Sequence, residues 1–177
     1  VVKENIRITD TIREADIDKA VSMIKNAKKP VIFVGGGAVI SGADKELKAF
    51  AERIDAPVCD TLMGKGAFSG EDDRYMGMLG MHGTKTANFG VSQCDLLVVV
   101  GARFSDRVTG NASKFASKAK IVQIDIDPAE IDKNIMTDAS ITGDVDAVLK
   151  LLNAKLEQQE HSEWKEQINE YKEKVVL

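Results

Sequence analysis

The sequence predicts a doubly wound α/β domain with a mostly parallel sheet and helices on both faces. Two observations carry this prediction. Segments with helical spacing of apolar residues alternate with short, continuously apolar segments, and each short segment ends at a glycine or next to an acid. Continuous apolar runs are typical of strands buried on both faces, as in parallel sheets. Their alternation with helices indicates βαβ units with right-handed crossovers, a Rossmann-like arrangement.

Each element has its own signal. Apolar residues three and four positions apart predict helices over residues 15–28, 43–54, 145–159 and 161–174, a short helix over 84–92 and a helical turn over 128–131. Apolar runs predict strands over residues 31–34, 56–60, 95–100, 120–124 and 141–142. Residues 61–83 are rich in glycine and methionine and show no clear period, so no regular element is predicted there.

Composition limits the class of protein and its partners. The 177 residues suit one domain of ordinary size, and 44% of them are apolar, which is enough to fill a core. The net charge is −4 with both signs interspersed, which argues against a nucleic-acid partner. No run of eighteen apolar residues is present and no signal peptide opens the chain. A cytoplasmic protein without a membrane partner is therefore expected.

The chain is expected to be a segment of a longer protein. We divide it into a lead-in or linker over residues 1–14, a central ligand-binding domain over 15–159, and a C-terminal helix or linker over 160–177. The last helix is very polar, with Trp164, Ile168 and Tyr171 on one side. It is therefore expected to serve as a linker or docking surface rather than as core.

The cysteines and histidines give no sign of a metal site. Cys59 and Cys94 each lie in an apolar stretch and are expected to be buried free thiols. His82 and His161 have no cluster of cysteines or histidines around them, so a structural zinc site is not expected.

The candidate site lies in the loops that follow the predicted strands, because open parallel sheets bind ligands beyond the carboxyl ends of their strands. Glycines in such loops let backbone N–H groups approach a pyrophosphate, arginines neutralise phosphate charge, and acids accept hydrogen bonds from ribose or adenine. The loops concerned begin with Gly35-Gly36-Gly37-Ala38, Thr61-Leu62-Met63-Gly64, Gly101-Ala102-Arg103, Asp125-Ile126-Asp127 and Gly143-Asp144.

Several of these signals also have a purely structural interpretation. The glycine run lacks a third glycine, since Ile40 stands in that place, and could form a tight turn. Asp60 could bind a ribose or serve as a turn or cap residue, and Asp125 and Asp144 could be helix caps. His82 could be a buried structural histidine. The methionines could fill the core or line a flat ring; they are Met63, Met76, Met78 and Met81.

Four segments closely resemble the central domain of the acetolactate synthase catalytic subunit, a thiamine-diphosphate enzyme. The resemblance runs from about residue 15 to about residue 152. The segments are Thr61-Leu62-Met63-Gly64-Lys65-Gly66, Leu79-Gly80-Met81-His82-Gly83, Gly101-Ala102-Arg103-Phe104-Ser105-Asp106-Arg107-Val108-Thr109-Gly110 and Ile124-Asp125-Ile126-Asp127-Pro128-Ala129-Glu130-Ile131.

The resemblance implies an enzyme of three α/β domains. The outer two bind thiamine diphosphate and Mg²⁺ and hold the catalytic glutamate, while the central one binds FAD, which has no net redox role. Such an enzyme decarboxylates pyruvate and joins the remaining two-carbon unit to a second 2-keto acid, opening branched-chain amino acid biosynthesis. A homo-oligomer with a small regulatory subunit is implied. The chain has neither the thiamine-diphosphate motif nor the catalytic glutamate segment, so no catalytic residue is assigned and the chain alone is expected to be inactive.

The resemblance also implies a role for each part of the cofactor site. Gly36 and Gly37 would approach the pyrophosphate or ribityl part of FAD. The flavin side would be lined by Thr61, Leu62, Met63, Leu79, Gly80, Met81 and His82. The ribityl and phosphate part would be contacted by Gly101, Ala102, Arg103, Ser105, Arg107 and Val108. The adenosine end would be held by Asp125, Ile126, Asp144 and Val145. Asp106 and Arg107 would also face the substrate channel, and Ser105 stands where the family usually has Asp.

Three other interpretations stay open. The chain could be the middle domain of another thiamine-diphosphate enzyme, such as glyoxylate carboligase, pyruvate oxidase or a 2-keto acid decarboxylase. It could be a free-standing NAD-binding module, which the place of Asp60 after the glycines would suit. It could also be an interaction domain with a vestigial nucleotide pocket.

Overall fold

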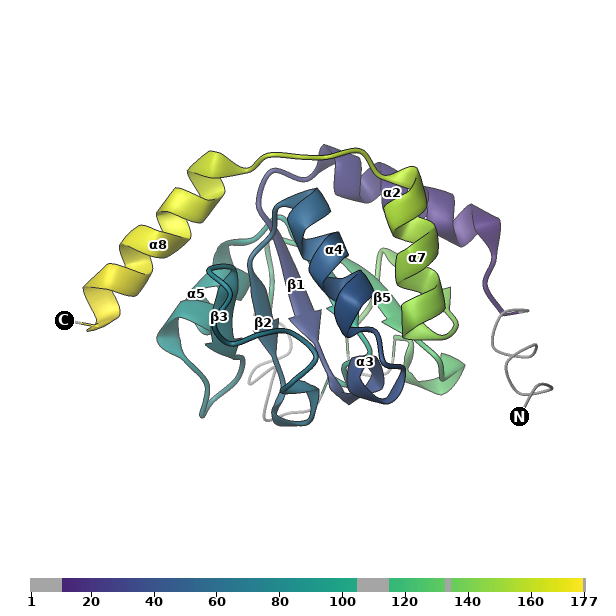
Figure 1. Cartoon of the computed structure of the whole chain (residues 1–177), viewed down its shortest axis with the longest axis horizontal. Helices are drawn as coiled ribbons and strands as arrows, with labels where there is room; N and C mark the ends of the chain where they lie inside the picture. The colour runs from purple at the N-terminus through teal and green to yellow at the C-terminus, as the bar shows by residue number, and fades with distance from the viewer. Residues whose placement is uncertain (1–10, 105–114, 133–134, 177) are drawn as a thin grey trace.

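The computed structural model describes residues 11–104, 115–132 and 135–176 and contains one sheet of six parallel strands, which confirms the predicted fold class (Figure 1). The strand order is β3-β2-β1-β4-β5-β6, so β1 and β4 are neighbours in the middle and the chain builds outward from them in both directions. The strands are β1 (Pro30–Val34), β2 (Val58–Asp60), β3 (Tyr75–Met78), β4 (Leu96–Val100), β5 (Lys120–Asp125) and β6 (Ala139–Thr142).

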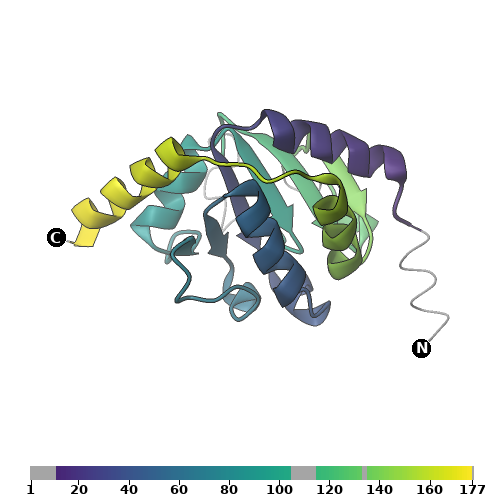
Figure 2. The same ribbon diagram turned by 45° about the horizontal axis from the view of Figure 1, so that its top comes forward.

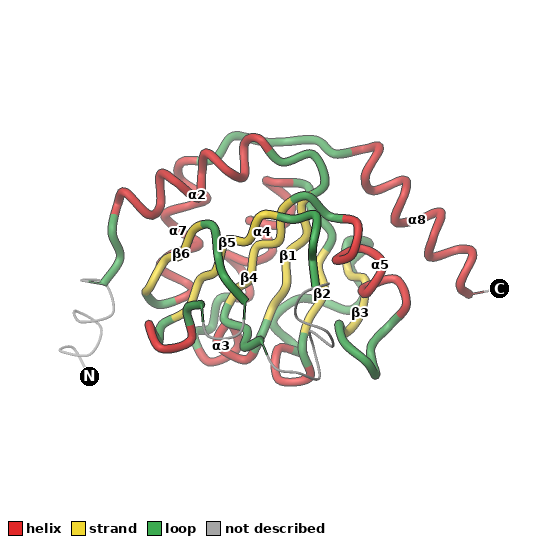
Figure 3. The backbone as a smooth tube through the Cα atoms, turned by 180° about the vertical axis from the view of Figure 1, so that it is seen from behind, coloured by secondary structure: helices red, strands yellow, loops and turns green. Residues whose placement is uncertain are grey.

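Helices cover both faces of the sheet. The first face carries α2 (Glu14–Asn26), α4 (Asp44–Ile54) and α7 (Val145–Lys155). The second face carries α5 (Lys85–Gln93) and α8 (Ser162–Val176), which lie on the side of β2 and β3 (Figure 3). Three short helical segments complete the fold: α3 (Gly36–Ile40), η1 (Leu62–Gly64) and η2 (Pro128–Glu130). None of these described helices has the length and apolar character needed to cross a membrane.

The strands are buried because both of their faces meet apolar side chains. All five residues of β1 and of β4 are buried, as expected for central strands of a parallel sheet. Alternate residues point to opposite faces, so Ile32 packs in the core below α2, α4 and α7, whereas Phe33 packs in the core on the second face. The sheet therefore separates two apolar cores within one domain.

The last helix contributes to the second core. Trp164 and Ile168 are 2% and 5% exposed, and the indole Nε1 of Trp164 donates to the carbonyl of Pro30 at 2.9 Å. Tyr171 stacks on Phe89 of α5 with ring centroids 3.9 Å apart. The expectation that this helix lies outside the core is wrong for Trp164 and Ile168. Burying their apolar side chains stabilises the docked helix even though the rest of it is polar.

Three elements were not predicted. Strand β3 and the short helix η1 fall within residues 61–83, where no regular element was predicted, and α3 begins at Gly36 within the glycine run. Strand β3 contains a bulge against β2 and Gly77 adopts a φ of 109°, so its pattern departs from regular alternation. Two of its carbonyls bind a single residue: Met76 accepts from the Thr84 hydroxyl at 2.7 Å and Met78 from the Thr84 N–H at 2.9 Å.

The connection between α7 and α8, which we call the strap (residues 156–161), crosses the end of the sheet where the strands begin (Figures 1 and 2). It is held by Arg53, whose Nη1 donates to the carbonyl of Leu156 at 2.9 Å and whose carbonyl accepts from the N–H of Gln159 at 2.8 Å. The ring of His161 bridges two carbonyl oxygens, that of Ile54 at 2.7 Å from Nδ1 and that of Ala27 at 3.0 Å from Nε2. The strap thus fixes where α8 begins.

Candidate functional site

The parallel sheet gathers the predicted site residues at one edge, which we call the carboxyl edge: the loops that directly follow the six strands. Backbone hydrogen bonds connect these loops to neighbouring strand ends. The N–H of Gly35 donates to Val100 at 3.0 Å, that of Thr61 to Val34 at 2.9 Å, and that of Gly101 to Ile124 at 2.9 Å. The described residues proposed for the cofactor therefore form one row along this edge, at strand ends, in loops or at the start of the helical segments that follow.

The middle of this edge is the point where the strand order reverses, between β1 and β4, which is where doubly wound sheets bind their ligands. Here the two loops touch backbone to backbone. A Cβ on Gly35 would lie 2.4 Å from Cα of Ala102, and one on Gly37 would lie 2.9 Å from Cα of Gly101. Gly101 itself has a φ of 62°. These glycines therefore serve close packing between the two loops, whatever they do for a ligand.

Apolar side chains project from the loops after β2 and β3. Leu62 and Met63 are 70% and 76% exposed, and Met81 is 76% exposed. Leu62 and Met63 belong to η1, which is capped because Thr61 Oγ1 accepts from the N–H of Gly64 at 3.0 Å. Leu79 and Gly80 are buried, and the side chain of Asn88 hydrogen-bonds to both the N–H and the carbonyl of Gly80. His82 is exposed, so its interpretation as a buried structural histidine is wrong.

Charged groups gather in the loops after β4 and β5. The Arg103 side chain is 78% exposed, and its Nε lies 3.8 Å from Oε1 of Glu130, a residue that is 8% exposed. Asp125 is also 8% exposed and accepts from the N–H of Asp127 at 2.9 Å. Burial raises the pKa of Asp125, and the nearby charges of Glu130 and Asp127 add to the rise, while the Asp127 N–H and Arg103 oppose it. Ile126 is 49% exposed beside this cluster.

Glu130 and Ser41 were not predicted as site residues. Glu130 belongs to a segment that resembles the family, but only the fold brings it to Arg103. Gln123, which is fully buried, donates from Nε2 to the Glu130 carbonyl at 3.0 Å and so supports the turn that carries Glu130. Ser41 lies 103 residues before Asp144 and donates to it, a contact that no local pattern reveals.

Asp144 and Val145 have structural roles at the end of the row. Oδ2 of Asp144 accepts from the N–H of Ala147 at 3.1 Å, which caps α7, and Oδ1 accepts from the Ser41 hydroxyl at 2.8 Å. The interpretation of Asp144 as a helix cap is therefore confirmed. For Asp125 the cap is instead its neighbour Asp127, which accepts from the N–H of Ala129. Val145 is 2% exposed and packs in the first core.

Four predicted residues lie outside the described part of the chain. They are Ser105, Arg107 and Val108, proposed for the cofactor, and Asp106, proposed with Arg107 for the substrate channel.

Asp60 is engaged within the fold rather than presented to a ligand. It is 1% exposed, and the Tyr75 hydroxyl donates to its carboxylate with both oxygens at 3.0 Å. Burial raises the pKa of Asp60, and burial together with the adjacent Asp60 charge raises the pKa of Tyr75 to about 12. A ribose-binding acid in a free-standing NAD module would need this carboxylate open, so the contact argues against that interpretation.

The two cysteines are free and buried, as expected. Burial raises the pKa of Cys94 to about 12, which makes a thiolate nucleophile unfavourable there.

Comparison with known proteins identifies the family. A family model described as "Thiamine pyrophosphate enzyme, central domain" matches residues 17–152. The chain is 51% identical over 159 residues to the "Probable acetolactate synthase large subunit" of Methanocaldococcus jannaschii, an alignment that covers 88% of this chain and 27% of that protein. It is 52% identical over 136 residues to the "Acetolactate synthase large subunit" of Cyanidium caldarium, covering 77% and 23%.

A third relative extends the alignment. The "Acetolactate synthase large subunit" of Parasynechococcus marenigrum is 45% identical over 168 residues, covering 93% of this chain and 27% of that protein. The chain thus spans about a quarter of the length of these curated relatives. Because the family model covers most of the chain and agrees with the resemblance of the four segments, the chain belongs to the family of thiamine pyrophosphate enzyme central domains.

Proposed function

We propose that this chain is the FAD-holding central domain of an acetolactate synthase. The observation that carries the proposal is the order of side chains along the carboxyl edge. The exposed apolar groups Leu62, Met63 and Met81 stand after β2 and β3, glycine backbone stands after β1 and β4, and Asp125 is the last residue of β5. An extended flavin dinucleotide has the same order: an apolar ring, a pyrophosphate, and a polar adenosine.

The residues fit FAD in chemical kind. Six strands about 4.8 Å apart give an edge roughly 24 Å long, which suits an extended ligand. Met63 and Met81 offer polarizable apolar surface for the ring. The exposed guanidinium of Arg103 offers forked donors for phosphate oxygens, and the carboxylate of Asp125 offers an acceptor for a ribose hydroxyl. In the family the bound FAD supplies no net oxidation or reduction.

The remaining parts of the reaction belong to domains outside this chain. Thiamine diphosphate, Mg²⁺ and the catalytic glutamate would come from those domains, and the whole enzyme would decarboxylate pyruvate and join the two-carbon unit to a second 2-keto acid in branched-chain amino acid biosynthesis. We propose a cytoplasmic homo-oligomer with a small regulatory subunit as its setting. We also propose that residues 160–177 lead toward a catalytic domain and that residues 1–14 are a lead-in. Ser105, Asp106, Arg107 and Val108 keep their proposed roles.

The relatives favour this enzyme over the other thiamine-diphosphate enzymes considered, because the relatives compared above carry the name acetolactate synthase.

The decisive experiment is a ligand comparison on the 177-residue chain. A ligand that binds only the folded state raises the melting temperature. We expect FAD to raise it and to lose flavin fluorescence on binding, while NAD at the same concentration does neither. Stabilisation by NAD but not by FAD would overturn the proposal in favour of an NAD module.

A second measurement addresses activity. We expect no pyruvate consumption by the chain alone with FAD, thiamine diphosphate and Mg²⁺ present. Turnover by the chain alone would show that a reaction centre lies within it and would contradict the division of roles proposed above.

A further inference from the structure

A cavity of about 240 Å³ lies between α8 and the beginning of β3. Pro57 and Arg74, which line it, immediately precede β2 and β3, so the cavity sits at the opposite end of the sheet from the carboxyl edge. Nothing in the proposed cofactor site uses it. Its walls are Pro57, Asp73, Arg74, Tyr75, Met76, Thr86, Lys165, Ile168, Asn169 and Lys172.

The charged groups on these walls are mostly positive. Arg74, Lys165 and Lys172 contribute three cations and Asp73 one carboxylate, in a chain whose net charge is −4. Lys165 and Lys172 are seven residues apart on α8, so both project from the same side of the helix toward Arg74. The cavity is therefore a local concentration of positive charge on an acidic protein.

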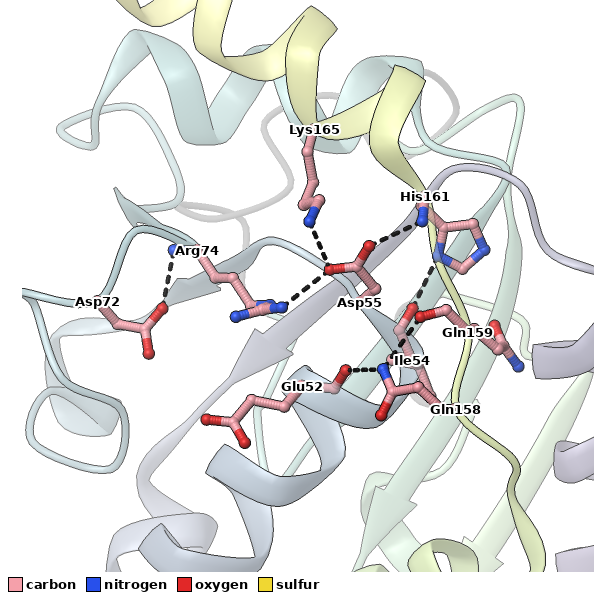
Figure 4. Close-up of polar contacts among 9 residues, drawn as sticks. All are labelled: Glu52, Ile54, Asp55, Asp72, Arg74, Gln158, Gln159, His161 and Lys165. Carbon is pink, nitrogen blue, oxygen red and sulfur yellow. Dashed lines mark hydrogen bonds and ion pairs between the residues drawn. The ribbon is translucent and has the colours of Figure 1, made fainter.

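Asp55 lies behind two of these cations and holds them in place (Figure 4). Its Oδ1 is 2.9 Å from Nη2 of Arg74 and 2.8 Å from Nζ of Lys165, and its Oδ2 accepts from the N–H of His161 at 2.8 Å. Asp55 is 4% exposed and does not line the cavity. Asp55 and Asp73 together carry two negative charges against three cations, so one positive charge remains unbalanced at the cavity.

Donors remain available on the cavity side. Lys172 makes no ion pair or hydrogen bond with any described residue, and Nη1 of Arg74 likewise has no hydrogen-bond partner in the described part of the chain. Arg74 is 24% exposed and its guanidinium is already fixed by Asp55, so little side-chain freedom is lost when a further acceptor arrives.

We propose that this cavity binds a phosphoryl group. A phosphate carries more than one negative charge and several acceptor oxygens, which suits a fixed guanidinium beside two ammonium groups. Asp55 orients Arg74 and Lys165, and Lys172 closes the site from the far end of the helix face. The partly apolar walls formed by Pro57, Met76 and Ile168 limit the water that competes for these donors.

The test is the binding of inorganic phosphate to the 177-residue chain, followed by isothermal titration calorimetry and by thermal shift against potassium chloride of equal ionic strength. We expect saturable one-to-one binding. Lys172→Gln should weaken it about ten-fold, because one of the direct charge partners is lost. Lys174→Gln, on the same helix but outside the cavity, should bind phosphate as the original chain does.

Lys172 is exposed on α8, so its replacement should leave the melting temperature without phosphate unchanged. Two results would overturn the proposal: no saturable phosphate binding by the original chain, or equal affinity in the Lys172→Gln variant. Binding of citrate with no binding of phosphate would also overturn it, since the site would then select carboxylates. None of these outcomes depends on FAD.

Discussion

The two ends of the sheet are built differently. At the end where the strands begin, carboxylates are engaged by backbone donors: Asp95 accepts from the N–H groups of Lys28 and Lys29 at 2.8 Å each, Asp138 from Ile121 at 2.8 Å, and Asp55 from His161. At the carboxyl edge, by contrast, apolar and charged side chains such as Met63 and Arg103 stand exposed.

This difference suggests that residues at one end of the sheet serve mainly stability, and that exposed residues at the other end serve mainly ligand binding. The carboxylates Asp55, Asp95 and Asp138 at the beginning of the strands are satisfied within the fold, so their loss should lower stability and leave FAD affinity intact. Exposed side chains at the carboxyl edge contribute few internal contacts, so their loss should lower FAD affinity and leave stability intact. The four predictions below sharpen or break this separation, from the largest expected effect to the smallest.

Glycines at the carboxyl edge should be an exception to this separation. Because the backbone there is tightly packed, replacing one of them should lower stability. Gly35→Ala places a Cβ 2.4 Å from both Cα of Ala102 and the Gly101 carbonyl oxygen, so we expect a loss of about 3 kcal/mol in the free energy of unfolding. Gly36→Ala is the matched control: its Cβ lies 3.2 Å from Cβ of the exposed Met63, and we expect a loss below about 1 kcal/mol. Urea unfolding measures both, and equal losses would contradict the packing argument.

Asp55→Asn tests the opposite end. Asparagine tolerates the φ of 51° at this position, so the variant removes the charge without adding backbone strain. We expect a loss of about 2 kcal/mol, because Arg74 and Lys165 lose their shared counter-ion. Asp73→Asn, at an exposed carboxylate, should change stability by less than about 0.5 kcal/mol. FAD affinity should be unchanged in both variants.

The direction in which the pKa of Asp55 is shifted predicts how the effect of Asp55→Asn changes with pH. Burial alone would raise the pKa of Asp55, but the His161 N–H, Lys165 and Arg74 outweigh it and lower the pKa below its ordinary value of 3.8. A lowered pKa in the folded state means that the carboxylate stabilises the fold above pH 3.8 and loses this effect as pH falls through the folded pKa. The stability difference between the original chain and Asp55→Asn should therefore shrink below about pH 4. A constant difference would refute the role of the charge.

Asp125→Asn should behave in the opposite way. Burial raises the pKa of Asp125 above 3.8, so the folded state holds the proton more tightly, and the charged form costs stability as pH rises through the raised pKa. Asparagine keeps the acceptor for the Asp127 N–H, so at pH 7 we expect stability without ligand to stay equal or to rise by up to about 1 kcal/mol. FAD affinity should fall about ten-fold, and a loss of stability with unchanged FAD affinity would contradict the assignment.

Met63→Ala should have the smallest effect on stability, since the side chain is 76% exposed. We expect a change below about 0.5 kcal/mol in unfolding, together with a smaller FAD-induced thermal shift. Leu151→Ala on α7, where the side chain is 43% exposed, is the control that should leave the FAD shift intact. Equal FAD shifts in all three proteins would remove Met63 from the proposed ring site.

The fold could be predicted from sequence because parallel strands are apolar on both faces. They therefore appear as continuous apolar runs, such as that of β4, which differ from the mixed polar and apolar pattern of exposed elements. Strand β3 could not be predicted, because Gly77 and a bulge interrupt its pattern and Tyr75 is only half-buried at the sheet edge. Helix α3 could not be predicted because glycine disfavours helix. Glycine is required there only because the segment packs closely against the loop after β4.

The row of candidate site residues could also be predicted, because a residue's place after a parallel strand decides the edge on which it lies. The role of each residue could not. Asp60 ends β2 and Asp144 follows β6, much as Asp125 ends β5, yet Tyr75 engages Asp60, and Ser41 and the start of α7 engage Asp144. Those partners are distant in sequence or set by loop geometry, so residue type alone could not distinguish them from ligand-binding acids.

Thr84 has a consequence for the behaviour of the molecule in crowded solution. An open strand at the margin of a sheet presents carbonyls on which a strand from another molecule can be templated, and this begins aggregation. In β3 one threonine already occupies the carbonyls of Met76 and Met78, and a bulge interrupts the regular spacing of the strand, so both features disfavour pairing with a strand of another molecule.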